Sequence, residues 1–279
     1  MKKKQSTKSC VKNIFLILFA SIWLFPILWI IVMSLKTTNE IFTSPFALPQ
    51  QAQWNNYVYA FNRMHFPKLL RNTMVVAIAS LSVTMLMSLF ASFAIARMNF
   101  GERKLQNLFY AFFISGIIVP AFILLFPVFL INSKMGINNN LLGVILPYVG
   151  WLAPMSILVM VGSFKSIPVS IEEAAAIDGC GVFRILFEVD IPIMKATIAT
   201  TLIINFLGIW NEFPLSSITL TNPNVQTISL AASQFMGQYT SNYAPMAAAL
   251  AILTVPQIIV FSSLQKYVVG NIAAGSIKG

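Results

Sequence analysis

Residues 163–195 read SFKSIPVSIEEAAAIDGCGVFRILFEVDIPIMK, and this stretch holds five of the eight acidic residues in a chain of 279. Ser170 and Glu173 stand three positions apart, which is the spacing of a capping box at the start of a helix. The residues 171–177 are strong helix formers, and Gly179 lies where a left-handed C-cap is easiest to adopt. The stretch therefore predicts a short helix that ends in a glycine turn.

A second amphipathic segment, 182–189, follows the turn. It precedes Asp190 and Pro192, which are typical of the first turn of a helix, here the fifth apolar span. Between residues 164 and 190 five acidic side chains outnumber two basic ones, so anionic lipid headgroups should repel this segment. A short acidic helix with few large side chains suits a groove on a basic partner protein. A solvated connecting loop is the alternative that charge alone leaves open.

The chain on both sides of this stretch is strongly apolar. Hydrophobic residues make up 57% of the sequence and charged residues 9%, which excludes an ordinary soluble domain. Several uncharged runs exceed the ~20 apolar residues that cross a bilayer as a helix. We therefore predict an all-α membrane protein with six transmembrane helices. They are expected at about 14–35, 72–96, 107–131, 141–163, 195–214 and 245–265.

The distribution of basic residues predicts the orientation in the membrane. Six spans place both termini on one side, and thirteen of the eighteen Lys and Arg residues lie at the termini or in the segments 97–106 and 164–195 on that side. The positive-inside rule then makes both termini cytoplasmic. Because orientation explains the net charge of +10, no nucleic-acid partner is predicted. Cys10 and Cys180 face a reducing compartment and are expected to be unpaired.

We divide the chain into three parts. Residues 1–71 hold the first span, which is too long for the apolar part of a signal peptide, and an outer segment whose aromatic residues suit a short helix at the headgroup level. Residues 72–265 form the membrane domain, with the acidic loop at 164–195. Residues 266–279 form a cytoplasmic tail. The outer segment 215–244 has no charge and is predicted to be a polar loop.

The sequence lacks the residues that ATP hydrolysis, metal binding and triad catalysis require. No glycine is followed by lysine, so the G-x-x-x-x-G-K-[ST] phosphate loop is absent and the chain is not expected to hydrolyse ATP itself. A single histidine, His65, and two cysteines make neither a typical metal site nor a catalytic triad. A membrane enzyme is therefore disfavoured, and no cofactor or metal is expected on this chain.

The acidic stretch also has the spacing of a known motif. The letters EAA at 173–175 are followed after three residues by Gly179, and nine residues later by VDIP at 189–192. This pattern resembles the EAA loop of ABC importer membrane subunits, EAA-x3-G-x9-I-x-L-P, from which Val189 and Ile191 are mild departures. Four other segments resemble the carbohydrate-importing branch, particularly the second permease subunit of maltose-type systems: 26–42, 55–57, 209–213 and 265–279.

The resemblance implies a six-span type I importer permease in the cell (inner) membrane, with a sugar such as an oligosaccharide or glycoside as its solute. The partners it implies are a second permease subunit, two cytoplasmic ATPase subunits that use the ATP, an extracytoplasmic sugar-binding protein and membrane lipid. In this family the segment that corresponds to 170–181 is the coupling helix seated on the ATPase, and the C-terminal tail also approaches the ATPases. The ATPase-coupling residues expected here are Glu172, Glu173, Ala174, Ala175, Ala176, Asp178 and Gly179. The acids are expected to face a basic groove, the alanines to permit close backbone approach, and the glycine to aim the helix.

An ion-coupled secondary transporter of small polar solutes is the alternative function. Such carriers usually place ionisable groups inside the membrane, and Glu212, near the outer end of the fifth span, is the candidate. Trp210, Asn211 and Glu212 offer an indole, an amide and a carboxylate to a sugar in a transport pathway. In the other interpretation, Trp210 belongs to the interfacial aromatic belt and Glu212 reaches water or a partner subunit. The acidic glycine-turn loop favours the importer, because a carrier has no need of it.

Overall fold

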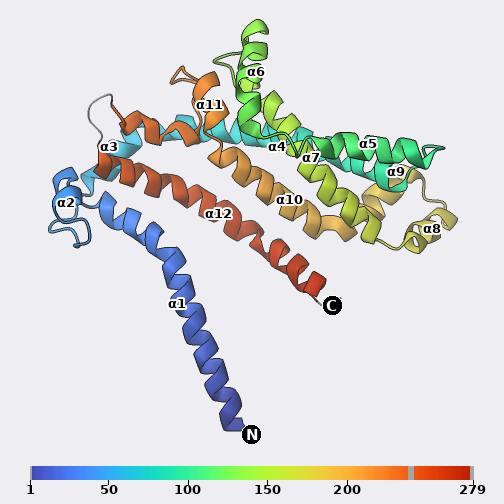
Figure 1. The fold of residues 1–279 in the computed structure, drawn as a ribbon, viewed down its shortest axis with the longest axis horizontal. Helices are drawn as coiled ribbons and strands as arrows, with labels where there is room; N and C mark the ends of the chain where they lie inside the picture. Colours follow the sequence, from blue (N-terminus) through green and yellow to red (C-terminus); the bar gives the residue numbers. More distant parts are fainter. Residues whose placement is uncertain (1, 238–241, 277–279) are drawn as a thin grey trace. The chain divides into compact units, whose positions relative to one another are not determined.

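The computed structural model describes residues 2–237 and 242–276, with side chains over 12–237 and 242–263. All regular elements in these residues are helices, as the sequence predicts (Figure 1). A helix suits an apolar run in a bilayer because it pairs each backbone N–H and C=O within the segment. The elements are α1 (Lys2–Ser34), α2 (Thr38–Thr43), α3 (Asn55–Arg63), α4 (Phe66–Arg97), α5 (Arg103–Ser115), α6 (Ala121–Lys134), α7 (Leu142–Ser166), α8 (Val169–Ile177), α9 (Val182–Arg184), the π-helix η1 (Ile185–Asp190), α10 (Ile191–Asn211), α11 (Pro214–Thr219), the 3₁₀ helices η2 (Ile228–Leu230) and η3 (Ala232–Phe235), and α12 (Tyr243–Ser276).

Five helical stretches among the described residues are long and apolar enough to cross a membrane. They are Lys12–Ser34, Phe66–Arg97, Leu142–Ser166, Val182–Asn211 and Tyr243–Ser263. These stretches match five of the six predicted spans, although the second and fifth begin earlier than predicted. The fold class is thereby confirmed.

The span predicted at 107–131 consists of two helices, α5 and α6, because the helical backbone is interrupted between Gly116 and Pro120. Gly116 lies against α7, where a Cβ atom would come within 2.7 Å of Cγ of Pro154. Pro120 stands before α6 with φ −63° and ψ 131°, and a proline disfavours helical backbone at the residue before it. The segment predicted as one span is therefore divided into two shorter helices.

The acidic loop is helical, but its two predicted start signals are not used. The capping box of Ser170 and Glu173 does not form, because α8 already begins at Val169 and has no side-chain capping bond. Asp190 is not an N-cap either, since its backbone is helical and η1 runs directly into α10. Pro192 has no N–H to donate to the preceding turn, and a π-helical turn absorbs this loss without ending the helix.

The chain forms two compact units. The first unit comprises Met1–Phe66 and Ala231–Pro256, and the second comprises Pro67–Leu230 and Gln257–Gly279. The predicted tail at 266–279 falls where the side chains are not described, and residues 277–279 lie outside the described residues altogether.

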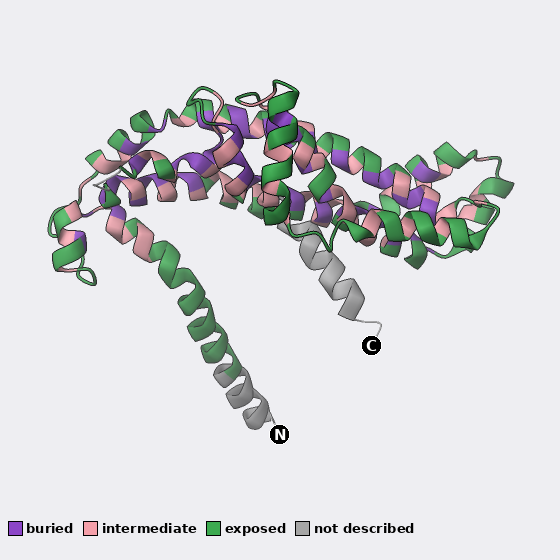
Figure 2. Ribbon diagram, turned by 45° about the horizontal axis from the view of Figure 1, so that its top comes forward, coloured by how far each residue is buried: buried purple, intermediate pink, exposed green. Residues whose placement is uncertain are grey.

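In the second unit, α4, α7 and α10 bury a common core, visible as the buried faces in Figure 2. Its main cluster is Leu89, Phe93, Met160, Phe164, Ile167, Leu186 and Met194. Along α4, small polar residues recur every fourth position and are fully buried: Ser80, Thr84, Ser88 and Ser92. The hydroxyl of Ser92 donates to the Ile157 oxygen on α7 at 3.3 Å. Small residues of this kind let membrane helices approach closely.

In the first unit, polar side chains close the end of α1. Asn56 donates to the backbone oxygens of Ser34 and Lys36 at 2.8 and 2.9 Å. The segment predicted to hold one short helix holds two, and a capping box of Thr37 and Glu40 starts α2. The hydrogen bond from the Thr37 backbone N–H lowers the pKa of Glu40. Residues 12–28 of α1 are exposed, and only the end of the helix, at Ser34, is buried (Figure 2).

Candidate functional site

The helix α8 ends as the sequence predicts. Gly179 has φ +85°, which is left-handed backbone, so the predicted C-cap is confirmed. The N–H of Cys180 donates to the Ala175 oxygen, and the N–H of Gly179 donates to the Ala176 oxygen, both at 3.0 Å. These are the two bonds of a Schellman motif, and they satisfy carbonyls that the helix leaves without partners. The turn thereby sets the direction in which the chain leaves α8.

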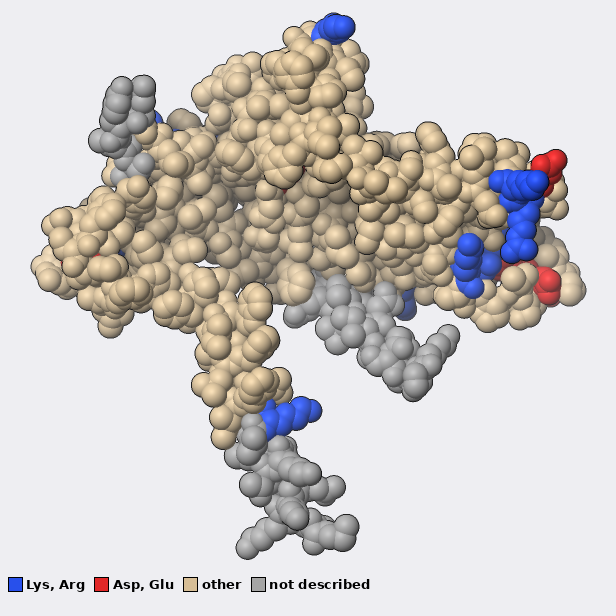
Figure 3. Space-filling view, in the orientation of Figure 1, with Lys and Arg blue, Asp and Glu red and all other residues tan. Residues whose placement is uncertain are grey.

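One face of α8 is open to the outside. Glu173, Ala174, Ala176 and Asp178 are exposed, Ala175 is half-buried, and Ile177 is 87% exposed. Figure 3 shows acidic and basic side chains gathered at the end of the second unit that carries α5, α8 and α9. The exposed surface of α8 therefore combines negative charge, small side chains and an apolar tip.

Glu172, which the sequence groups with these acids, lies on the inner side of α8. Its Oε1 accepts a hydrogen bond from Nε of Arg97 at 2.6 Å, and its side chain is 12% exposed. Sequence reasoning missed Arg97 as its partner. The available signal was that Arg97 directly follows an apolar run, at the first position of the segment 97–106. The structure thus separates Glu172 from Glu173 and Asp178, whose side chains face outward.

Glu212, the candidate pathway residue, holds the start of α11. Its Oε1 accepts from the N–H of Leu215 at 2.7 Å, and its Oε2 accepts from the N–H and hydroxyl of Ser216 at 3.1 and 3.0 Å. The hydroxyl of Tyr148 donates to the same Oε2 at 2.6 Å. The carboxylate therefore links α7, the end of α10 and α11.

A cavity of about 370 Å³ lies beside this carboxylate in the second unit. Apart from Glu212 its lining is mostly apolar and aromatic: Gly116, Val119, Ala121, Leu124, Leu125, Val128, Pro147, Tyr148, Gly150, Trp151 and Leu215. Trp210 is not part of this lining, because it is 3% exposed and packs on Phe206 with ring centroids 5.4 Å apart. Asn211 is exposed and donates to the Leu207 oxygen of its own helix at 2.9 Å. The three predicted pathway residues therefore do not form one site.

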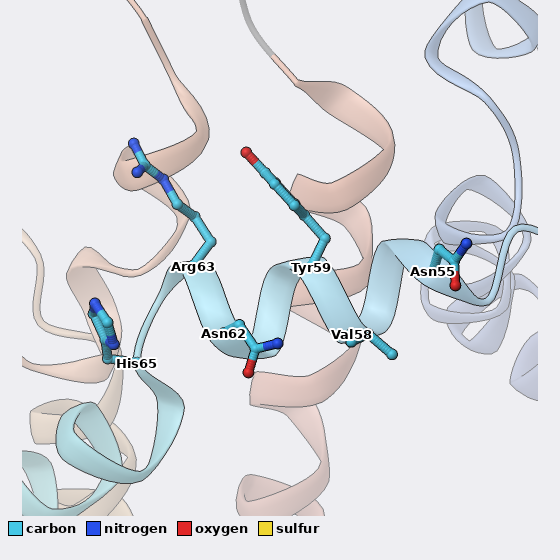
Figure 4. A pocket seen from close by; sticks show the side chains of 6 residues that line it. All are labelled: Asn55, Val58, Tyr59, Asn62, Arg63 and His65. Carbon is cyan, nitrogen blue, oxygen red and sulfur yellow. The ribbon is translucent and has the colours of Figure 1, made fainter.

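An open groove of about 610 Å³ runs along α3 in the first unit. Five of its six lining residues carry a polar group, although most of the exposed lining is apolar: Asn55, Val58, Tyr59, Asn62, Arg63 and His65 (Figure 4). Tyr59 and Arg63 point to the same side of α3, and both also line a neighbouring hollow of about 260 Å³ with residues 234–237 and Asn242. The described side chains contain no group of three or more His, Cys, Asp or Glu that could hold a metal ion.

Residues 88–273 match a protein family described as binding-protein-dependent transport system inner membrane component. The chain belongs to this family of permeases. It is a membrane transport subunit, as the resemblance of its acidic loop to the EAA loop implies.

This permease is similar over most of its length to curated relatives. The diacetylchitobiose uptake system permease protein NgcG of Streptomyces coelicolor is 31% identical over 97% of this chain and 89% of the relative. The multiple sugar-binding transport system permease protein MsmG of Streptococcus mutans is 31% identical over 100% of this chain and 100% of the relative. The sulfoquinovosyl glycerol transport system permease protein SmoH of Agrobacterium fabrum is 33% identical over 92% of this chain and 89% of the relative.

A solved structure has the same fold. A chain of a bacterial ABC transporter involved in the import of the acidic polysaccharide alginate superposes with a TM-score of 0.77, covering 95% of this permease and 98% of that chain. Its sequence identity is 21%, so the similarity concerns the fold. The break between α5 and α6 therefore does not remove the permease from the importer fold.

Proposed function

We propose that this permease is a subunit of an ATP-driven importer for a sugar, such as an oligosaccharide or glycoside. The relatives named for diacetylchitobiose, for multiple sugars and for sulfoquinovosyl glycerol support this solute class. In the proposed assembly the permease pairs with a second permease, two ATPase subunits that bind the ATP, and an extracytoplasmic sugar-binding protein. Both termini then lie on the cytoplasmic side, as the distribution of Lys and Arg indicates.

The coupling contact is proposed at the exposed face of α8, and the geometry of this helix is the observation that carries the proposal. Its outward residues Glu173 and Asp178 suit a basic groove, the small alanines suit close backbone approach, and Ile177 supplies an apolar contact. The Schellman turn at Gly179 holds that face in one direction. A loop that only connected two spans would need neither an exposed acidic face nor a defined C-cap at the end of its helix.

We assign the outer partner to the groove along α3. The groove lies in the segment that the charge distribution puts outside the cytoplasm, and its lining includes the cation of Arg63 and the amides of Asn55 and Asn62. Such a surface suits the polar and acidic side chains of a docking protein. We assign this chain's contact with the solute to the cavity beside Glu212, where the carboxylate and the half-exposed ring of Trp151 are available.

The coupling proposal is tested in the complete transporter with Glu173→Lys and Gly179→Val. Reversing the charge of Glu173 costs about 2–5 kcal/mol at a desolvated charged contact, which is roughly a 30-fold to several-thousand-fold weakening. Valine at position 179 disfavours the left-handed backbone and misdirects the helix. Both variants should insert and bind the outer partner normally. Retention of the ATPase in a pull-down and binding-protein-stimulated ATP hydrolysis should both fall.

Two matched controls separate these effects from general damage. Glu102→Lys makes the same charge reversal at an exposed residue before α5. Gly181→Val adds the same side chain where φ is −72° and no atom lies within 4 Å of the added Cβ. Both controls should keep near-normal hydrolysis. Normal ATPase retention and normal stimulated hydrolysis in the Glu173 and Gly179 variants would show that α8 is only a connector.

A further inference from the structure

Arg97, the last residue of α4, joins the ends of three helices in the second unit. Its Nε donates to Glu172 at 2.6 Å, and its Nη2 donates to the backbone oxygens of Phe164 and Ile167 at 2.6 and 2.9 Å. The side chains of Arg97 and Glu172 are 11% and 12% exposed, so the pair is largely shielded from water. One guanidinium thereby connects the end of α4, the end of α7 and the first turn of α8.

The chemistry of this position suits arginine in particular. The last carbonyls of a helix lack their usual partners four residues on, and a cation is favourable at a helix C-terminus. At the end of α7 the Phe164 oxygen accepts from the Ile167 N–H at 3.1 Å and has a second lone pair for the guanidinium. A guanidinium presents its N–H groups in one plane and in fixed directions, so it can serve two carbonyls and a carboxylate together. Lysine would keep the charge, but its compact ammonium lacks this planar fork.

The helix α8 packs against η1, and the contact with Arg97 adds a polar link to the rest of the second unit. Its N-cap, Pro168, makes no side-chain capping bond, and none of its residues is buried. Glu172 is the acid in its first turn, where a negative charge is favourable. The bond between Glu172 and Arg97 is therefore a polar anchor of α8 on the body of the second unit.

A second acid lies at the same place. Asp190, in η1, is fully buried and lies beside both Glu172 and Arg97. Without the guanidinium, two carboxyl groups would face each other in a shielded position. Alanine at position 97 is therefore expected to disturb folding, and milder substitutions are needed to isolate the contact with α8.

We propose that Arg97 is a positioning residue for transport coupling. Through Glu172 it fixes the direction in which α8 presents Glu173 and Asp178 to the ATPase. This inference rests on the proposed coupling function of α8. It assigns to the inner side of α8, which carries Glu172, a role that differs from the role of its exposed face: the inner acid orients the helix, and the outer acids make the contact.

The test uses the complete transporter with Arg97→Lys, Glu172→Gln and the double variant. Losing a hydrogen bond to a charged group changes a conformational equilibrium by about tenfold or more, so each single variant should lower binding-protein-stimulated ATP hydrolysis about tenfold. Because both residues act through one contact, the double variant should be no worse than the more severe single variant. The thermal midpoint of the purified permease is measured for each variant, so that a loss of coupling is distinguished from a loss of folding.

Glu188→Gln is the control, because it removes an exposed ion pair with Arg184 (2.8 Å, side chains 61% and 59% exposed) and should leave stimulated hydrolysis unchanged. Normal stimulation in Arg97→Lys and Glu172→Gln, together with uncoupling by Glu173→Lys, would overturn the positioning role and leave the proposed function standing. Normal stimulation in all three would remove the proposed function itself. Additive losses, or losses that follow a lower thermal midpoint, would identify Arg97 as a structural brace and overturn the inference.

Discussion

At the scale of single residues, Trp210 and Glu212 are close neighbours in the chain with separate surroundings. Trp210 is buried among the side chains of its own unit. Glu212 collects donors from Tyr148 on α7 and from the start of α11. An acceptor with four donors is firmly held, so we expect this carboxylate to order the outer end of α10 as well as to line the cavity.

Replacing Glu212 with Gln tests this expectation. The amide keeps one oxygen, but its NH₂ group faces N–H donors, which leaves polar groups unsatisfied at a cost of about 1–3 kcal/mol. The thermal midpoint of the purified permease should fall, and relative uptake among sugars by the complete transporter should change. Asn211→Ala is the matched control, since Asn211 is exposed and bonds to its own helix. Equal midpoints for the two variants would contradict the ordering role, and unchanged selectivity would contradict the pathway role.

At the scale of helices, α7 is shaped by close approaches that only a glycine permits. At Gly143 a Cβ atom would lie 2.6 Å from the Ile137 oxygen and 2.8 Å from Cγ2 of Thr219. The carbonyl of Gly143 also accepts from Nδ2 of Asn132 at 2.7 Å. The start of α7 is therefore packed against both α6 and α11. The nearest atom is the backbone oxygen of Ile137, which has little room to move.

Gly143→Ala should accordingly destabilise the permease, by about 1–3 kcal/mol as is usual for overpacking. Gly162→Ala in the same helix is the control, because nothing lies within 4 Å of its added Cβ and alanine favours the helix. Thermal unfolding in detergent, followed by circular dichroism, measures both. If Gly143→Ala is as stable as Gly162→Ala, the close approach at the start of α7 does not limit the fold.

Two errors of sequence reasoning also belong to this scale. Membrane helices tolerate Gly and Pro, so Gly116 and Pro120 did not by themselves indicate an interruption of the third span. The Ser170 and Glu173 spacing was a valid capping signal, but Pro168 allows helical backbone to begin at Val169, ahead of the expected cap. Both outcomes depend on what packs against the segment, which composition does not reveal.

At the scale of the whole molecule, this permease has apolar surface that its own chain does not cover. The most apolar 18 residues within Lys12–Ser34 include none that is buried, and 28% of the corresponding residues within Tyr243–Ser263 are buried. Lipid and partner subunits are the surroundings that the family implies for such helices. We therefore expect the chain to work only as a subunit of a transporter complex.

Reconstitution of the permease alone in vesicles tests this expectation. It should neither hydrolyse ATP nor accumulate sugar, because the sequence has no phosphate loop. Vesicles that also hold the second permease, the ATPases and the binding protein should accumulate sugar when ATP is present on the ATPase side. Uptake by the permease alone, driven by a proton gradient, would instead support an ion-coupled carrier.

The sequence by itself determined the all-α membrane class, five of the spans and the glycine turn after α8. These features depend on hydrophobicity over a window and on residue type at short spacing, which are local properties. The tertiary structure decided the break between α5 and α6, the inward direction of Glu172 and the partners of Glu212. Arg97 and Glu172 are 75 positions apart, and Tyr148 and Glu212 are 64 apart. Such pairs arise only when the helices pack, because packing chooses which side chains meet.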